Sequence, residues 1–370
     1  MLEIYFRFRS THALIAIQHT WMETLDNKGS VRALFVDFKK AFDIVNHNIL
    51  FNKLKKFNIS HCLLKWVASY LFQRTQRVRV HNQISSWKTL SGSMPQGSRL
   101  GPLAFIVMID DLKAQCEVHK FVDDTTLSEL IPPSHPATGM AGFFTHLLTW
   151  TADNDMQINT SKTKEMILGR INPADIPLLS TPVGSVERVT NFKLLGVHLE
   201  ASLSWAAHIN HIVAKASKRL YFLKQLKRAG VPQQQLLHFY TAVIRPVLEY
   251  ASPVWHYAIT RAQATQLESV QKRAIHIIFN LTRGSSYLYL LAIASLDSLQ
   301  DRRENTSKST FQKISQSNSC LNYLLPPLRD TTMISRLRIT TPYPRPTTRT
   351  KKYQSFINFA LNKYQTAVKF

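Results

Sequence analysis

The sequence predicts an α+β protein in which a mixed body of strands and helices precedes a bundle of basic helices. Three observations lead to this prediction. Apolar runs of strand length recur up to about residue 199, apolar residues at helical spacing dominate to about residue 283, and the remainder is rich in Lys, Arg and Pro. We therefore expect three regions, residues 1–199, 200–283 and 284–370, the last only partly regular.

The first region carries the clearest strand signals. Residues 30–38, SVRALFVDF, form an apolar run that ends in Asp37 and Phe38, which predicts a buried strand with an acid at its carboxyl end. Residues 116–122 and 125–130 predict a hairpin around Asp123 and Asp124. Further strands are expected at 164–170 and 192–200 and, half-exposed, at 76–82, with helices at 46–59, 61–72, 101–115 and 140–153.

Long amphipathic helices are expected after residue 202. Residues 204–230 place one apolar stripe on a helix face, and a stop signal follows at Gly230 and Pro232. Residues 232–255 predict a second helix, bent at Pro246, and residues 262–282 a third. Residues 301–370 hold 13 Lys and Arg against 3 Asp and Glu, which predicts a loosely ordered basic tail with a short terminal helix. The apolar stripe expected in residues 204–230 consists of Ile209, Ile212, Ala216, Leu220 and Leu223.

Composition indicates a polyanionic partner. The formal net charge is +23, and such an excess repels itself in a compact state unless a negative partner is present. Nucleic acid is the leading candidate, and an anionic membrane surface ranks well below it because neither end carries an amphipathic basic anchor. Three scattered cysteines, no apolar run of ~18 residues and no secretory signal predict an intracellular protein of the nucleus or cytoplasm, not a secreted or membrane-spanning one.

Three aspartates form the candidate reactive centre. If the strand that ends at Asp37 neighbours the hairpin of Asp123 and Asp124, the three carboxylates converge. Carboxylates held close together repel one another unless a cation neutralises them, and hard oxygen ligands suit Mg²⁺ or Mn²⁺. Taken singly, each has an ordinary interpretation: a solvated turn for the pair and a strand-end cap for Asp37.

The order of these segments resembles a known family. Residues 33–47, ALFVDFKKAFDIVNH, resemble motif A of reverse transcriptases, residues 91–105, SGSMPQGSRLGPLAF, motif B, and residues 121–124, FVDD, motif C. Residues 7–14, 158–169 and 192–199 resemble a finger motif, motif D and the primer grip, and residues 208–226 and 267–279 resemble the thumb. The sequence is most similar to the enzymes of non-LTR (LINE-type, jockey-like) retrotransposons, truncated at the N-terminus, over about residues 6–280.

The resemblance implies a right-hand polymerase fold, with a palm and a remnant of fingers in residues 1–199 and an all-α thumb in residues 200–283. It assigns catalysis to Asp37, Asp123 and Asp124, and metal binding to these and the carbonyl of Phe38, with Asp124 in a supporting position. It further implies nucleotide or template contacts by Phe42, Gly92, Pro95, Gln96, Gly97, Lys162 and Lys164, and a primer grip at Phe192, Leu194, Leu195 and Gly196.

Several of these residues keep an ordinary alternative. Phe42, at the family's steric-gate position, could equally be a core residue of a following helix, and Gln96 an ordinary loop glutamine. Lys162 and Lys164 compete for the motif D role, and either could be a solvated charge at a strand edge.

The activity implied is RNA-directed DNA synthesis with two Mg²⁺ or Mn²⁺ ions, an RNA template, a DNA primer and dNTP. The family's triphosphate-gripping fingers and its endonuclease are not recognised here. We therefore expect an incomplete nucleotide pocket unless a partner chain or an N-terminal segment supplies them. One alternative is a catalytically inactive, nucleic-acid-binding relic, and another is an RNA-directed RNA polymerase or maturase-like protein.

Overall fold

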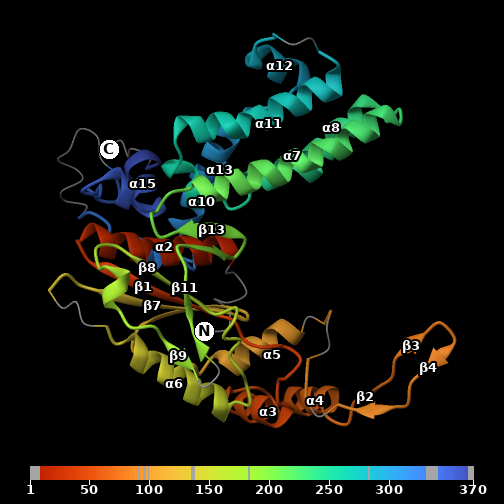
Figure 1. Cartoon of the computed structure of the whole chain (residues 1–370), viewed down its shortest axis with the longest axis vertical. Helices are drawn as coiled ribbons and strands as arrows, with labels where there is room; N and C mark the ends of the chain where they lie inside the picture. The colour runs from red at the N-terminus through yellow and green to blue at the C-terminus, as the bar shows by residue number, and fades with distance from the viewer. Residues whose placement is uncertain are drawn as a thin grey trace. The chain divides into compact units, whose positions relative to one another are not determined.

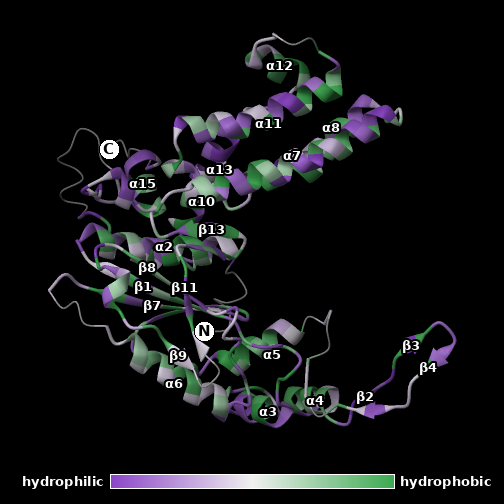
Figure 2. Ribbon diagram, in the orientation of Figure 1, coloured by the Kyte–Doolittle hydropathy of each residue, from purple (hydrophilic) through white to green (hydrophobic). Residues whose placement is uncertain are grey.

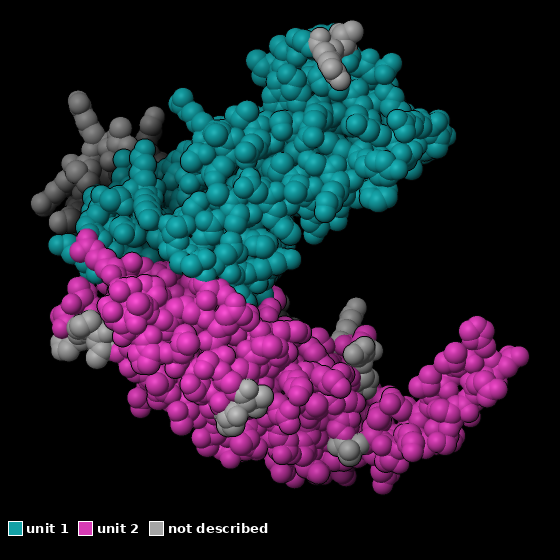
Figure 3. Space-filling model, viewed as in Figure 1, with its two compact units in different colours: residues 1–28, 190–370 teal, residues 29–189 magenta. Residues whose placement is uncertain are grey.

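The computed structural model describes residues 9–90, 92–94, 97–98, 100–134, 138–181, 184–281, 284–330 and 341–365 (Figure 1). The chain forms two compact units, coloured separately in Figure 3. Unit 1 contains residues 1–28 and 190–370, and unit 2 contains residues 29–189. The three regions expected from the sequence were defined by hydrophobic pattern and composition rather than by compactness, and their boundaries stay predictions.

Unit 2 is built on a five-stranded sheet of order β11-β8-β1-β7-β6. The pairs β8–β1, β1–β7 and β7–β6 are antiparallel, and only β11 runs parallel to its neighbour β8. Strand β1 is central and buried at every position, which explains why its sequence is apolar apart from Ser30 and Arg32. The expected strand and hairpin are confirmed. The strands are β1 Ser30–Val36, β6 Glu117–Phe121, β7 Asp124–Ile131, β8 Lys164–Leu168 and β11 Glu187–Arg188.

A buried ion cluster fastens three of these strands together. The carboxylate of Glu165 in β8 accepts from Arg32 Nε of β1 at 2.6 Å and from Arg188 Nε of β11 at 2.7 Å. Arg32 also donates to the hydroxyl of Thr138 at 2.7 Å. Because every charge has a partner, the cluster can remain inside the sheet layer without a large desolvation penalty.

Four helices complete the body of unit 2, and all four were expected. They are α3 His47–Lys56, α4 His61–Leu71, α5 Leu100–Ile109 and α6 Met140–Asp153. Asn46 caps α3 by accepting from the amides of Asn48 and Ile49, and Ser60 caps α4. Helix α5 is apolar along its length in Figure 2, as its buried position requires.

Two lysines cap the carboxyl end of α5. Lys53 Nζ donates to the carbonyl of Met108 at 2.6 Å, and Lys120 Nζ of β6 donates to the carbonyl of Ile109 at 2.7 Å. Positive charge at this end complements the helix dipole. Since Lys120 is desolvated, its pKa falls to about 8. These bonds tie strand β6, and therefore the aspartate hairpin, to α5.

One strand predicted in unit 2 is not a single strand in the structure. Residues 76–82 were expected as one half-exposed strand, but the chain makes two separate short ladders that are exposed throughout. The ladders pair β2 Thr75–Gln76 with β5 Lys88–Thr89, and β3 Arg79–Val80 with β4 Gln83–Ile84. The valine alternation indicated a buried face, but nothing in unit 2 covers the described residues of this segment. A second ribbon, β9 Ser180–Thr181 with β10 Gly184–Ser185, and the 3₁₀ turn η1 Pro173–Asp175 precede β11.

Unit 1 is mainly helical. Helix α7 packs against α11, and the five stripe residues expected on α7 are all buried, so that prediction is confirmed. The α-helices that the structure describes in this unit are α2 Ser10–Asp26, α7 Ala206–Arg228, α8 Gln233–Phe239, α9 Arg245–Glu249, α10 Ser252–Trp255, α11 Arg261–Phe279, α12 Tyr287–Ala294, α13 Leu299–Ile314 and α15 Phe356–Lys363. It also contains the hairpin β12 Asn191–Leu194 and β13 Val197–Glu200, and the 3₁₀ turns η3 His256–Ala258, η4 Asn322–Leu324 and η5 Lys351–Tyr353.

The expected single helix over residues 232–255 is interrupted twice. A π-helical turn, η2 Tyr240–Ile244, ends two residues before Pro246, which has no amide proton to continue the α-helical ladder. The chain then turns at Ala251, whose φ is 50°, and α10 begins. The predicted bend is therefore present, but the break at Ala251 was missed.

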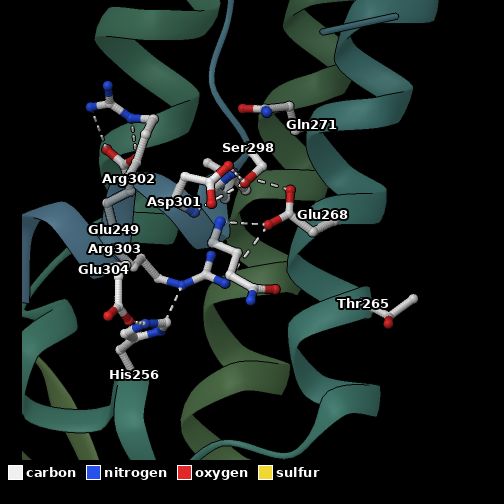
Figure 4. A network of polar contacts seen from close by, with 12 residues as sticks. Glu249, His256, Thr265, Glu268, Gln271, Ser298, Asp301, Arg302, Arg303 and Glu304 are labelled. Atoms are coloured by element: carbon white, nitrogen blue, oxygen red, sulfur yellow. Dashed lines mark hydrogen bonds and ion pairs between the residues drawn. The ribbon is translucent and has the colours of Figure 1, made fainter. Parts of the chain in front are cut away.

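The tail is more ordered than expected, and this is a correction. Helix α13 occupies residues 299–314 with Phe311 and Ile314 buried, while the short terminal helix α15 is confirmed. Figure 4 shows why α13 is fixed: Arg303, which is fully buried, donates to Nδ1 of His256 and pairs with Glu268, and Arg302 pairs with Glu249. Polar residues of a segment that the sequence predicted as loosely ordered are instead held by partners on other elements of unit 1.

No helix among the described residues is long and apolar enough to cross a membrane.

Candidate active site

Asp37 lies one residue beyond β1, and hydrogen bonds from the segment of residues 157–163 hold its backbone in place. Its amide donates to Thr163 Oγ1 at 3.2 Å, and its carbonyl accepts from the amide of Asn159 at 2.8 Å. Lys39 continues the same ladder by donating to the carbonyl of Gln157 at 2.8 Å. Sequence reasoning missed Thr163 and Asn159, because nothing local marks two polar residues as the support of a residue so distant in sequence.

Asp123 and Asp124 lie at the tip of the β6–β7 hairpin. Phe121 and Asp124 form its last pair, so Val122 and Asp123 make a two-residue turn. The φ of Val122 is 57°, a left-handed conformation that costs a β-branched residue of order 1–3 kcal/mol. Such strain persists only where the surrounding structure imposes it.

The strand register brings the three aspartates to one end of the sheet. Val36 pairs with Thr125 in the β1–β7 ladder, so the next position, Asp37, falls opposite Asp124. The negative charges influence one another. The pKa of Asp124 is raised to about 6, first because its surroundings desolvate it and then because Asp123 and Asp37 repel its charge. Asp124 retains solvent contact, so this desolvation is partial.

The donor set suits a hard divalent cation. Because the backbone of Asp37 bonds toward residues 157–163, the carbonyl of Phe38 faces the other edge of β1, where β7 lies. No hydrogen bond to this carbonyl occurs among the described residues. Three carboxylates and a free carbonyl are ligands that Mg²⁺ or Mn²⁺ accepts. Within the described ranges no three Asp, Glu, His or Cys side chains are placed so that they could hold a metal ion, so metal binding by the aspartates stays a prediction.

The glycine-rich motif is bound to the segment that follows Asp37. The amide of Met94 donates to the carbonyl of Phe42 at 2.8 Å, and Gly92 bridges to Asn46. A Cβ on Gly92 would lie 2.9 Å from the carbonyl oxygen of Val45, so only glycine fits there. Gly97 has a positive φ, 80°, whereas the predicted contacts Pro95 and Gln96 lie outside the described residues.

Phe42 lies in a turn, not in the helix of its ordinary interpretation. Its half-buried ring packs 5.1 Å from the ring of Phe105 in α5. The role of Phe42 in sugar selection stays a prediction.

The two candidate lysines are in different environments. Lys164 Nζ is held 2.7 Å from the carboxylate of Glu187 and also donates to the carbonyl of Ser161. Lys162 is exposed and has no ion pair among the described residues. Lys162 is therefore the lysine that remains available to a phosphate, a distinction that the sequence left open.

The expected primer-grip strand is a hairpin, which is a second correction. Leu194 pairs with Val197, so Leu195 and Gly196 form the turn with φ values of 46° and 84°. Positive φ at both central positions is typical of a type I′ turn, for which glycine is favoured. The hydroxyl of Tyr250 donates to the carbonyl of Leu195 at 2.9 Å and holds the tip. Phe192 lies on β12 of the same hairpin, in unit 1.

An antiparallel sheet that carries a strand-end aspartate opposite an Asp–Asp hairpin is the arrangement expected of a polymerase palm. The chain belongs to the reverse transcriptase (RNA-dependent DNA polymerase) family, whose model matches residues 3–199, more than half of its length. A short second match, residues 205–245, is to the model described as alkylated DNA repair protein alkB homolog 8, N-terminal, and covers little more than α7 and α8.

Similar proteins come from insect mobile elements. The chain is 26% identical over 294 residues to the probable RNA-directed DNA polymerase from transposon BS of Drosophila melanogaster, covering 74% of this chain and 32% of that protein. It is 24% identical to the RNA-directed DNA polymerase from mobile element jockey of the same species, covering 74% and 31%. It thus spans about a third of these relatives, and the resemblance to non-LTR reverse transcriptases is confirmed.

Solved structures give only distant likenesses. Telomerase from Candida albicans, in a complex with a fragment of telomeric RNA, is 12% identical with a TM-score of 0.37, covering 87% of this chain and 54% of that one. The corresponding telomerase from Candida tropicalis is 13% identical with a TM-score of 0.40, covering 86% and 53%. These scores are too low to support an argument.

Proposed function

We propose that this chain carries the catalytic palm of an RNA-directed DNA polymerase, which extends a DNA primer on an RNA template with dNTP. The observation that carries the proposal is the register that sets Asp37 opposite the Asp123–Asp124 hairpin. Family membership supports the choice of template and product. The matched segment covers only about a third of the relatives, so the activity of the chain alone is part of the proposal.

Divalent cations, when bound at such carboxylates, favour the ionised primer hydroxyl and neutralise the charge of the departing pyrophosphate. Asp37 and Asp123 would hold them together with the carbonyl of Phe38, and Asp124 would add negative charge beside them. The fixed backbone of Asp37 preorganises this group, because no strand has to move when the substrate binds.

Two further side chains would act on the nucleotide. Lys162 would offer its ammonium to the pyrophosphate, since Lys164 is already paired with Glu187. The ring of Phe42 would lie against the sugar and disfavour a 2′-hydroxyl, which selects dNTP over NTP. The basic helices of unit 1 would bind backbone phosphates without reading sequence.

Primer extension tests the proposal. The purified chain should extend a labelled DNA primer on an RNA template in the presence of Mg²⁺. Asp123→Asn, which preserves the side-chain shape, should abolish extension, while Asp153→Asn, an exposed acid of α6, is the matched control. Extension that survives Asp123→Asn, or no extension by the unaltered chain, would refute the catalytic proposal.

Lysine variants sharpen the test. Lys162→Ala should lower the extension rate by a larger factor than Lys164→Ala, since general acid and electrostatic assistance is typically worth ~10²–10⁴-fold. Equal rates for the two variants would remove the proposed distinction between them.

The alternative expected from the sequence, a catalytically inactive fragment, is not favoured by the family match. A nucleic-acid-binding fragment without catalysis would bind RNA with a steep salt dependence and add no nucleotide. The same extension assay, run beside an RNA-binding titration, separates the two functions.

A further inference from the structure

The longest stretch of one charge sign in the protein lies in unit 2. Between Asp43 and Asp110 the sequence has no acidic residue and has nine lysines and arginines. Of these, Lys53 is neutralised by Asp111 at 2.6 Å. Most of the others that the structure describes are exposed. A surface of this kind attracts a polyanion along its whole length.

Part of this stretch, Arg74–Leu90, is a ribbon that we call the arm. It projects from the body of unit 2 in Figures 1 and 3. Its ladders are joined by bonds from Leu90 N to the carbonyl of Arg74 at 2.8 Å and from Ser85 N to the carbonyl of Val78 at 2.9 Å. Every residue from 75 to 89 is exposed. An isolated two-stranded ribbon is only marginally stable in water, so a partner would stabilise it.

Planar side chains are displayed on the arm and on the helix that leads to it. On the arm, the guanidinium of Arg77 lies 4.6 Å from the ring centre of Trp87, which is 59% exposed. On α4, the 56% exposed Trp66 is stacked on Tyr70, with ring centres 5.7 Å apart and planes 11° from parallel. Arg74 covers the same Tyr70 at 5.0 Å.

These groups have the properties of a platform for unpaired bases. Aromatic rings and guanidinium planes stack on bases of any sequence, and arginines beside them neutralise the phosphates. A purely hydrophobic partner would not explain a segment without acids. A folded duplex would hide its base faces from the rings, whereas a single strand exposes both its bases and its phosphates.

We propose that the arm, together with the face of α4 around Trp66, binds single-stranded RNA by stacking bases on Trp87 and Trp66 while its arginines contact phosphates. The site, as proposed, needs neither metal nor nucleotide. The proposal rests on the proposed function only for the choice of RNA over DNA. A measurement of RNA binding in EDTA without nucleotide therefore tests this proposal independently of primer extension.

The test is fluorescence anisotropy of a short unstructured RNA with the full 370-residue chain. Trp87→Leu and Trp66→Leu should each weaken binding roughly 5- to 100-fold, the worth of one stacked base, without changing the salt dependence. Trp87→Phe should retain most of the affinity. Arg77→Gln should lower the slope of log affinity against log salt by about 0.7.

The matched control is Tyr323→Leu, since Tyr323 is a 69% exposed aromatic residue of unit 1. It should leave RNA affinity unchanged, and circular dichroism should show equal folding for all variants. The proposal is overturned if both tryptophan variants bind RNA as tightly as the unaltered chain, which is the outcome if another polypeptide covers the arm. It is also overturned if they weaken only the binding of single-stranded DNA.

Discussion

Replacing Asp124 by Asn should stabilise the metal-free protein at neutral pH. In the folded state the pKa of Asp124 is about 6 against an ordinary 3.8, so the folded state binds a proton that the unfolded chain has already released. Stability from this group is complete below about pH 4 and is lost as the pH rises through 6. The destabilisation caused by the Asp124 charge is therefore largest above pH 6. An uncharged Asn at this position would not cause it.

The magnitude follows from the shift. A change of about two pH units is worth ~3 kcal/mol for a fully buried group, and the solvent contact of Asp124 reduces this to ~1 kcal/mol. For a unit of this size the melting temperature should rise by ~2–4 °C at pH 7 and by nothing near pH 4.

The assay is thermal unfolding followed by circular dichroism in EDTA from pH 4 to pH 8, with Asp153→Asn as the control for loss of one charge. The difference in melting temperature between Asp124→Asn and the unaltered chain should grow with pH. If it does not grow, or if the variant is less stable than the unaltered chain at pH 7, the three aspartates do not repel one another as argued. Added Mg²⁺ should stabilise the unaltered chain more than Asp124→Asn.

Three further substitutions test the fold around the site by chemical denaturation. Glu165→Gln should cost ~3–5 kcal/mol, because it leaves Arg32 buried without its charge partner; a loss under 1 kcal/mol would contradict the buried cluster. Gly92→Ala should cost ~1–3 kcal/mol, because the new methyl group would meet the carbonyl of Val45, and no loss would mean that the two segments are not in contact. Gly142→Ala, on the open face of α6, should instead stabilise the protein by ~0.5–1 kcal/mol, and a loss there would contradict its exposure.

Elements with a strong hydrophobic period were predictable. Helix α6 begins and ends where the sequence predicted, and the apolar stripe of α7 is buried as expected. The run at residues 30–36 was recognisable as a central strand because both of its faces are apolar. In these segments the local pattern and the tertiary environment agree, so sequence alone was sufficient.

Elements that depend on distant partners were not predictable. Helix α13 has a mostly polar sequence, and it is fixed because Arg303 finds His256 and Glu268 on other elements of unit 1. The exposed arm was predicted as a half-buried strand because alternating valines normally mark a covered face. Short turns such as Leu195–Gly196 were missed because only the glycine hints at the positive φ values.

The candidate site divides in the same way. By itself, the sequence determined which residues are candidates for the chemistry: three aspartates in a fixed order and a glycine-rich segment, together with a large excess of positive charge. Only the tertiary structure decided that Asp37 falls opposite Asp124, that Thr163 and Asn159 hold its backbone, and that Lys164 is paired while Lys162 is not. The physical reason is that the identity and charge of a side chain are local properties. Its partners depend on strand register, which joins residues far apart along the chain.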